Sequence, residues 1–121
     1  MIHVIVVDDQ ALIRGALSAL IDLEDDMEVV AQAGNGHEAL AAIEAHTSAH
    51  PGSEVPLVVI MDVEMPVMDG ISTATALKER GSAARVLMVT TFGRPGYVQR
   101  ALDAGALGFV VKDLSLIHIS E

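Results

Sequence analysis

Apolar residues gather in five short runs along the chain, and polar residues follow each run. The runs cover residues 2–7, 27–33, 57–61, 85–89 and 108–111 and consist mainly of valine, isoleucine, leucine, methionine and alanine. Short uninterrupted runs of this kind are typical of strands buried on both faces, as in a parallel sheet. The third run, LVVIM, ends abruptly at Asp62, and Pro66 prevents the strand from continuing far beyond it.

Between these runs, apolar residues recur at helical spacing. The spacing predicts helices over residues 11–23, 37–45, 71–80 and 95–105, while 47–56 (TSAHPGSEVP) holds two prolines and a glycine and is predicted to be a surface loop. The alternation of strand and helix predicts an α/β fold, a doubly wound five-stranded parallel sheet with helices on both faces.

The carboxyl end departs from this alternation. A sheet of this type needs a further helix after the fifth strand, but only LSLIHISE remains at 114–121, in which Ile117 and Ile119 alternate with polar residues. We therefore expect one domain over 1–113, a truncated or non-native tail over 114–121, and a last helix that is truncated or absent. The sheet face left uncovered would form an apolar patch, which predicts self-association.

Composition narrows the class of protein. A chain of 121 residues that is 51% hydrophobic can bury one core, and without cysteine it has neither disulfides nor thiolate metal sites. The formal net charge of −10 argues against direct binding to a nucleic-acid backbone. No apolar run approaches the roughly 20 residues of a membrane span, and no signal peptide precedes the first strand, so we expect a cytoplasmic domain with no membrane partner.

Polar residues at the ends of the runs converge in the predicted fold. Asp8-Asp9, Asp62 and Thr90-Thr91 each follow a run, and Lys112 follows the last one. Each has an ordinary interpretation by itself, as a helix cap, a strand-end hydroxyl or a solvated amine. Because the carboxyl ends of parallel strands lie along one edge of the sheet, the set predicts a single site there.

The chemistry of this set favours phosphoryl transfer. Three neighbouring carboxylates repel one another unless a cation joins them, and hard oxygen ligands favour Mg²⁺. A neighbouring aspartate can then act as nucleophile and form an aspartyl phosphate. Lys112 would supply positive charge to the transferred group and Thr90 a hydroxyl hydrogen bond.

Four motifs resemble one known family. VVDD at 6–9, MDVEMPVMDG at 61–70, MVTTF at 88–92 and GFVVKD at 108–113 are similar, in this order, to the receiver domain of bacterial two-component response regulators, which has the flavodoxin-like (CheY-like) fold. The resemblance covers about residues 2–113 and is closest to the NarL/FixJ type. It implies a phosphorelay protein that switches a transcriptional output.

The resemblance also implies the acceptor and its metal site. Asp62 matches the phosphoacceptor, which a sensor histidine kinase modifies. Asp9 matches the direct Mg²⁺ ligand, and Asp8 a neighbour acting largely through water. Glu64 matches the position whose backbone carbonyl completes the metal site.

A second set of positions matches the switch. Thr90 corresponds to the switch hydroxyl, Lys112 to the amine that pairs with the phosphoryl group, and Phe109 to the aromatic position that turns inward on activation. Asp113 stands where many receivers have proline, so the local geometry there is expected to differ. DNA would be reached only through an output domain absent from this chain.

Two other functions remain as alternatives. One is a magnesium-dependent phosphohydrolase with Asp62 as nucleophile, but Glu64 stands where the common family of this type carries an aspartate, and the chain leaves no room for a cap over the substrate. The other is a phosphorylation-independent receiver used for protein contacts, which the filled acceptor, metal, Thr90 and Lys112 positions disfavour. The five histidines lack ligand spacing and are interpreted as surface or edge residues rather than a metal site.

Overall fold

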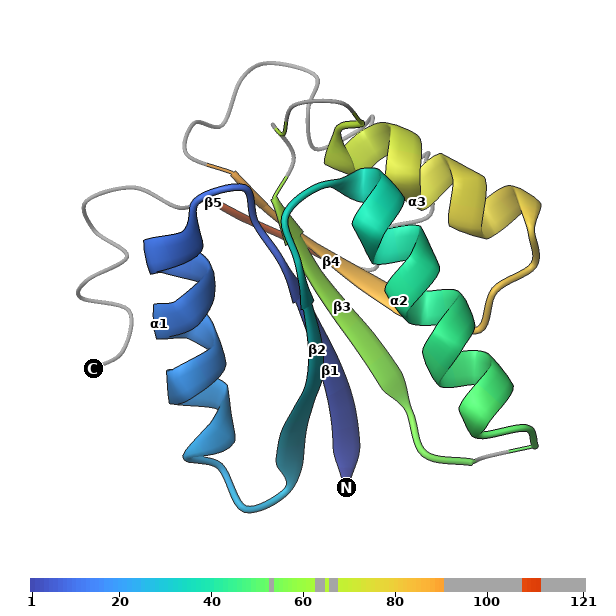
Figure 1. Cartoon of the computed structure of the whole chain (residues 1–121), viewed down its shortest axis with the longest axis horizontal. Coiled ribbons are helices and arrows are strands. Elements are labelled where there is room, and N and C mark those ends of the chain that lie inside the picture. Colours follow the sequence, from blue (N-terminus) through green and yellow to red (C-terminus); the bar gives the residue numbers. More distant parts are fainter. Residues whose placement is uncertain (53, 63–64, 66–67, 91–107, 112–121) are drawn as a thin grey trace.

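Five parallel strands form one sheet in the order β2-β1-β3-β4-β5 (Figure 1). The computed structural model describes residues 1–52, 54–62, 65, 68–90 and 108–111, with side chains as far as residue 89. The strands are β1 (Ile2–Val7), β2 (Met27–Ala33), β3 (Leu57–Asp62), β4 (Arg85–Thr90) and β5 (Gly108–Val111). The predicted fold class is confirmed, and the strand that ends in Asp62 lies at the centre of the sheet.

Helices cover both faces of this sheet. Helix α1 (Ala11–Asp22) lies on one face, and α2 (Gly36–Ala49) and α3 (Gly70–Glu79) lie on the other (Figure 1). The helix predicted over 95–105 and the tail at 114–121 fall outside the described residues. None of the helices in the described part of the chain is long and apolar enough to cross a bilayer.

Burial on both faces explains why the strands read as continuous apolar runs. In β1, Val4 and Val6 are as fully buried as Ile5 and Val7, although successive side chains point to opposite faces. The hydrophobic core cluster lies on the face of α2 and α3. The helices add Ala39, Leu40, Ile43, Ala74 and Leu77 to the strand residues in it.

Helix α2 is longer than the sequence pattern predicts. It continues to Ala49, through part of the segment predicted as a loop. Its end coincides with the first residues that cannot extend it, because Pro51 disfavours helical backbone at His50 and Gly52 has a φ of +71°. Asn35 caps the start of this helix, since its side chain accepts a hydrogen bond from the Glu38 N–H at 2.9 Å.

Helix α1 keeps much of its apolar surface in solvent. Ser18 is its one buried residue. Leu12 and Leu20 in the helix are 86% and 56% exposed, and Leu23, just beyond the end of the helix, is 77% exposed. We call these three leucines the outer leucines of α1. They form a hydrophobic surface on the opposite face of the sheet from α2 and α3.

Candidate functional site

The loop after β1 holds two adjacent aspartates in fixed positions. The Asp8 N–H donates to the Ala33 carbonyl at 3.1 Å, and Asp8 Oδ1 accepts from the Gln10 N–H at 2.9 Å. Arg14 Nη1 reaches back from α1 and donates to the Asp8 carbonyl at 2.7 Å. Asp8 is therefore tied to β2, to its own loop and to α1, and only 2% of it is exposed, whereas Asp9 lies in solvent.

Asp62 is the last residue of the central strand. Its backbone pairs with Val89 of β4, and the preceding Met61 is fully buried in the core. Because successive residues of a strand face opposite sides, burial of Met61 helps to fix the direction of the Asp62 side chain. Asp62 is 7% exposed, so its carboxyl group is largely shielded from solvent.

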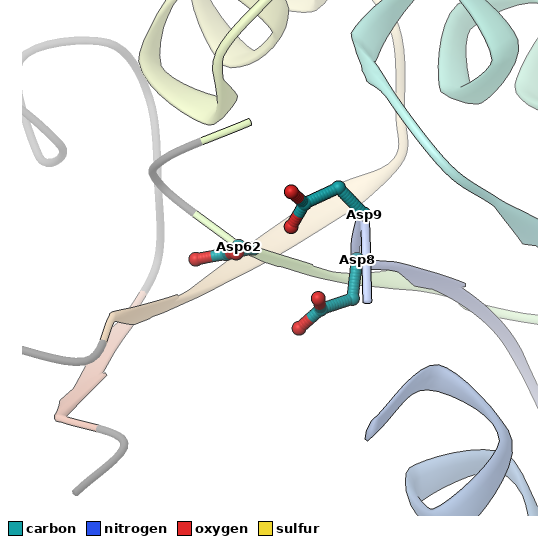
Figure 2. Close-up of side chains that lie close together, drawn as sticks. All are labelled: Asp8, Asp9 and Asp62. Atoms are coloured by element: carbon teal, nitrogen blue, oxygen red, sulfur yellow. The ribbon is translucent and has the colours of Figure 1, made fainter. Parts of the chain in front are cut away.

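The three carboxylates meet beyond the ends of β1 and β3. One oxygen of each of Asp8, Asp9 and Asp62 lies within 4.8 Å of the others, and Figure 2 shows the side chains gathered at the strand ends. Three negative groups this close favour a bound cation. A set of hard oxygen donors without nitrogen or sulfur suits Mg²⁺, so the residues present fit that ion.

The other predicted site residues are only partly visible. Thr90 ends β4, the strand next to β3, and Phe109 lies on β5 opposite Met88, but their side chains are not described. Glu64 and Lys112 lie outside the described residues. The structure thus brings together Asp8, Asp9 and Asp62 and puts the backbones of Thr90 and Phe109 on the two adjacent strands.

Two positions that support the site were missed by the sequence reasoning. Arg14 fixes the Asp8 carbonyl, and its only sequence signal is a basic residue one turn into a helix that follows two aspartates. Gly36 donates its N–H to the Met68 carbonyl at 3.1 Å, which ties the start of α2 to the loop between β3 and α3. A side chain at Gly36 would collide with Thr73, so glycine permits this close approach.

That loop ends in a well-formed helix cap. Asp69 Oδ1 accepts from the Ser72 N–H at 2.7 Å at the start of α3. Asp69 therefore has a structural role, although it lies in the same motif as Asp62. The cap and the Gly36 contact together fix residues 68 and 69, where the chain enters α3.

Comparison with known proteins agrees with this geometry. Residues 4–121 match the model of the response regulator receiver domain. The chain is 46% identical over 121 residues to the transcriptional regulatory protein YvfU of Bacillus subtilis, covering all of this chain and 56% of that protein. It is 41% identical over 113 residues to the transcriptional regulatory protein DesR of the same organism, covering 93% of this chain and 52% of DesR. The chain spans about half the length of these curated relatives.

Solved structures of response regulators also superpose on this chain. A DNA-binding response regulator of the LuxR family from Staphylococcus aureus superposes with a TM-score of 0.83 at 33% identity, over 98% of this chain and 92% of that one. The signal receiver domain of the response regulator NarL from Mycobacterium tuberculosis superposes with a TM-score of 0.76 at 33% identity, over 93% and 84% of the two chains. With five parallel strands in this order and three carboxylates at their carboxyl ends, the chain belongs to the response regulator receiver domain family and is a receiver domain of a two-component system.

Proposed function

We propose that Asp62 is the phosphoacceptor of this receiver domain and takes a phosphoryl group from a sensor histidine kinase in the presence of Mg²⁺. The observation that carries the proposal is the meeting of Asp8, Asp9 and Asp62 within 4.8 Å at the end of the central strand. Asp62 is the member of this trio that ends a strand, and 7% of it remains exposed.

Within this proposal the two other aspartates hold the metal in different ways. The exposed carboxylate of Asp9 is suited to direct coordination. Asp8 already accepts a backbone hydrogen bond on Oδ1, which supports a role largely through water. The backbone carbonyl of Glu64 would complete the set, as the family resemblance implies.

The chemical step is a displacement at phosphorus. A carboxylate oxygen of Asp62 attacks the phosphoryl group, an O–P bond forms, and the P–N bond to the kinase imidazole breaks, so the imidazole leaves with the electron pair. A bound Mg²⁺ would neutralise the charge on the phosphoryl oxygens. The amine of Lys112 and the hydroxyl of Thr90 would bind the transferred group once it is on Asp62.

Phosphorylation of Asp62 would change the structure at β4 and β5. Thr90 pairs with Val111 and Met88 with Phe109, so the hydroxyl and the aromatic ring belong to neighbouring positions of two paired strands. A phosphoryl oxygen that draws the Thr90 hydroxyl inward would vacate space for Phe109. The surface formed by this edge of the sheet would then change.

At the level of the whole regulator we propose the NarL/FixJ type, acting in the cytoplasm. The motif pattern and the LuxR-family relative from Staphylococcus aureus support this choice. DNA would be bound by a separate output domain, because a domain with a formal net charge of −10 is a poor ligand for a phosphate backbone. Self-association would bury the outer leucines of α1.

The test is phosphorylation by acetyl phosphate, followed by intact mass measurement with and without Mg²⁺. The parent chain is expected to gain one phosphoryl group only with Mg²⁺, and Asp62→Asn is expected to gain none while keeping its fold. Asp69→Asn is the matched control, since it makes the same change in the same motif and asparagine also caps a helix well.

The outcomes separate the proposal from its alternatives. A stable phosphoryl group on Asp62→Asn at parental yield would contradict the acceptor assignment. Repeated release of phosphate from a simple phosphomonoester, with many turnovers per chain, would instead support the phosphohydrolase. A parent chain that takes up no phosphoryl group under any condition would support the phosphorylation-independent receiver.

A further inference from the structure

Three histidines from separate segments meet at the amino-terminal end of the sheet. His3 belongs to β1, His46 to the last turn of α2, and His50 follows that helix. His3 Nδ1 lies 2.8 Å from His46 Nε2, and the His46 and His50 rings stack with centroids 4.4 Å apart. His3 and Asp8 are five residues apart in β1 and its end, about 17 Å at the usual strand rise, so this cluster is separate from the acidic site.

A carboxylate sets the orientation of His3. Glu28 Oε2, on the neighbouring strand β2, lies 3.6 Å from His3 Nε2, and the His3 side chain is only 13% exposed. With a proton on Nε2, facing this carboxylate, His3 directs the lone pair of Nδ1 at His46. Metal-binding histidines usually have this arrangement: one ring nitrogen faces a carboxylate, and the other nitrogen coordinates the metal.

His46 is the second nitrogen of the pair. Burial, and then the neighbouring rings of His50 and His3, hold the pKa of His46 below its usual value. The ring is therefore neutral near pH 7, which is the form that binds a metal. Two nitrogens on one tetrahedral zinc ion lie about 3.3 Å apart, so the observed 2.8 Å separation needs only a small expansion.

His50 is placed to supply a third nitrogen. It comes four residues after His46, one helical turn along the same face, and its Nδ1 now bonds to the His46 carbonyl oxygen at 2.9 Å. Because His50 is exposed, its ring can turn without disturbing the core. Both rings border a surface hollow of about 760 Å³, open to water, and the carboxyl end of a helix favours a cation.

We propose that His3 Nδ1, His46 Nε2 and a reoriented His50 bind one divalent transition-metal ion, Zn²⁺ being the representative case, with water as the remaining ligand. Imidazole nitrogens suit zinc and not magnesium, so the two ends of the sheet bind different ions. On binding, His46 Nε2 gives up the proton it shares with His3 Nδ1, and His46 takes a proton on Nδ1, so the ring stays neutral. The ion would join the start of β1 to the end of α2.

The test is calorimetric titration of the untagged chain with Zn²⁺ while excess Mg²⁺ occupies the acidic site. One zinc ion per chain is expected, with binding weakened tenfold or more by His46→Gln, a loss of the size seen on disturbing a metal site. His37→Gln is the matched control and should bind like the parent, because His37 is an exposed histidine at the other end of α2. His50→Gln, at an exposed position, gives a second variant in which folding is not at risk.

Nitrogen-15 spectra of the histidine rings give an independent readout. Zinc is expected to shift His3 Nδ1 and His46 Nε2 and to move the His46 proton to Nδ1, while the His37 signals stay unchanged. Equal zinc binding by the parent, His46→Gln and His50→Gln, or zinc-dependent shifts confined to the aspartates at the other end of the sheet, would overturn the proposal.

Discussion

At the scale of single residues, two adjacent aspartates of the acidic site differ in burial and in hydrogen bonding. Asp8 is buried and held by hydrogen bonds to its N–H, its carbonyl and its carboxylate, whereas the neighbouring Asp9 is exposed. The free energy of folding therefore depends more on Asp8, and the affinity for a cation more on Asp9. This division allows the metal site to be weakened without unfolding the domain.

We predict that Asp9→Asn lowers the affinity for Mg²⁺ by about tenfold or more, because a ligand charge is lost from the trio. The rate of phosphorylation by acetyl phosphate, measured against Mg²⁺ concentration, should shift to higher concentrations by the same factor. Asp25→Asn is the control, since it removes the same charge from an exposed turn. Identical Mg²⁺ dependence in the parent and Asp9→Asn would exclude Asp9 as a ligand.

At the scale of elements, α2 and the loop before α3 are joined at one glycine. The Gly36 N–H bonds to the Met68 carbonyl, and the space where a side chain would begin is filled by Thr73 and Met68. Thr73 is completely buried and donates its hydroxyl proton to the Asp69 carbonyl at 2.7 Å, so it cannot move aside easily. The start of α2 thus fixes Met68, just before the cap of α3.

We predict that Gly36→Ala destabilises the domain by about 1–3 kcal/mol, the usual range for forcing extra atoms into a packed site. Gly15→Ala should instead stabilise it by roughly 0.5–1 kcal/mol, because Gly15 lies within α1 with open space around it. Urea unfolding followed by circular dichroism measures both changes. A Gly36→Ala variant as stable as Gly15→Ala would show that the close approach is not required.

The prediction for the switch rests on the pairing of β4 with β5. Thr90→Ala should still be phosphorylated, since Asp62 and the metal ligands are intact, but the response of β5 should weaken. Amide hydrogen exchange over 108–111, compared with and without phosphorylation, measures that response. Thr75→Ala serves as the control, because that hydroxyl donates to the Ile71 carbonyl within α3, away from β4 and β5. An equal response in the parent and Thr90→Ala would contradict the coupling.

At the scale of the whole molecule, the sheet separates two kinds of chemistry. Carboxylates gather at the carboxyl ends of the strands and imidazoles at the amino ends, with the core between them. The outer leucines of α1 form a third, apolar surface. The prediction of self-association, made from the expected truncation of the last helix, stays a prediction, and these leucines give it a definite location.

We expect the scattering mass of the chain to rise with concentration in the micromolar range, because association would remove the outer leucines of α1 from water. The double variant Leu12→Ser and Leu23→Ser changes two leucines eleven residues apart, which lie on one side of α1. It should remain a monomer, whereas Val55→Ser, in the loop before β3, should behave like the parent. A parent chain that is monomeric throughout would refute the prediction.

The apolar runs by themselves determined most of the fold. The predicted ranges of β1, β2 and β5 coincide with the observed strands. In β1 the reason is that a strand covered on both faces is apolar at nearly every position. The same patterning placed Asp8, Asp9 and Asp62 at one edge, because parallel strands end together. The end of α2 was predicted less well, because the loop-like composition begins before Pro51 and Gly52, where the helix actually stops.

Tertiary structure alone decided which distant residues touch. The spacing of His46 and His50 puts them one helical turn apart, but nothing in the sequence brings them to His3, and the prediction of scattered histidines did not anticipate the cluster. The three meet because α2 runs antiparallel to β1 and returns its last turn to the start of that strand. Arg14 and Gly36 gained their roles in the same way, through contacts with β1 and with the loop before α3. The pattern of apolar and polar positions in the sequence shows which side chains are buried, and this pattern determined the strands and the edge at which they end. Contacts between polar groups depend on the packing angles and lengths of whole elements, which only the folded chain defines.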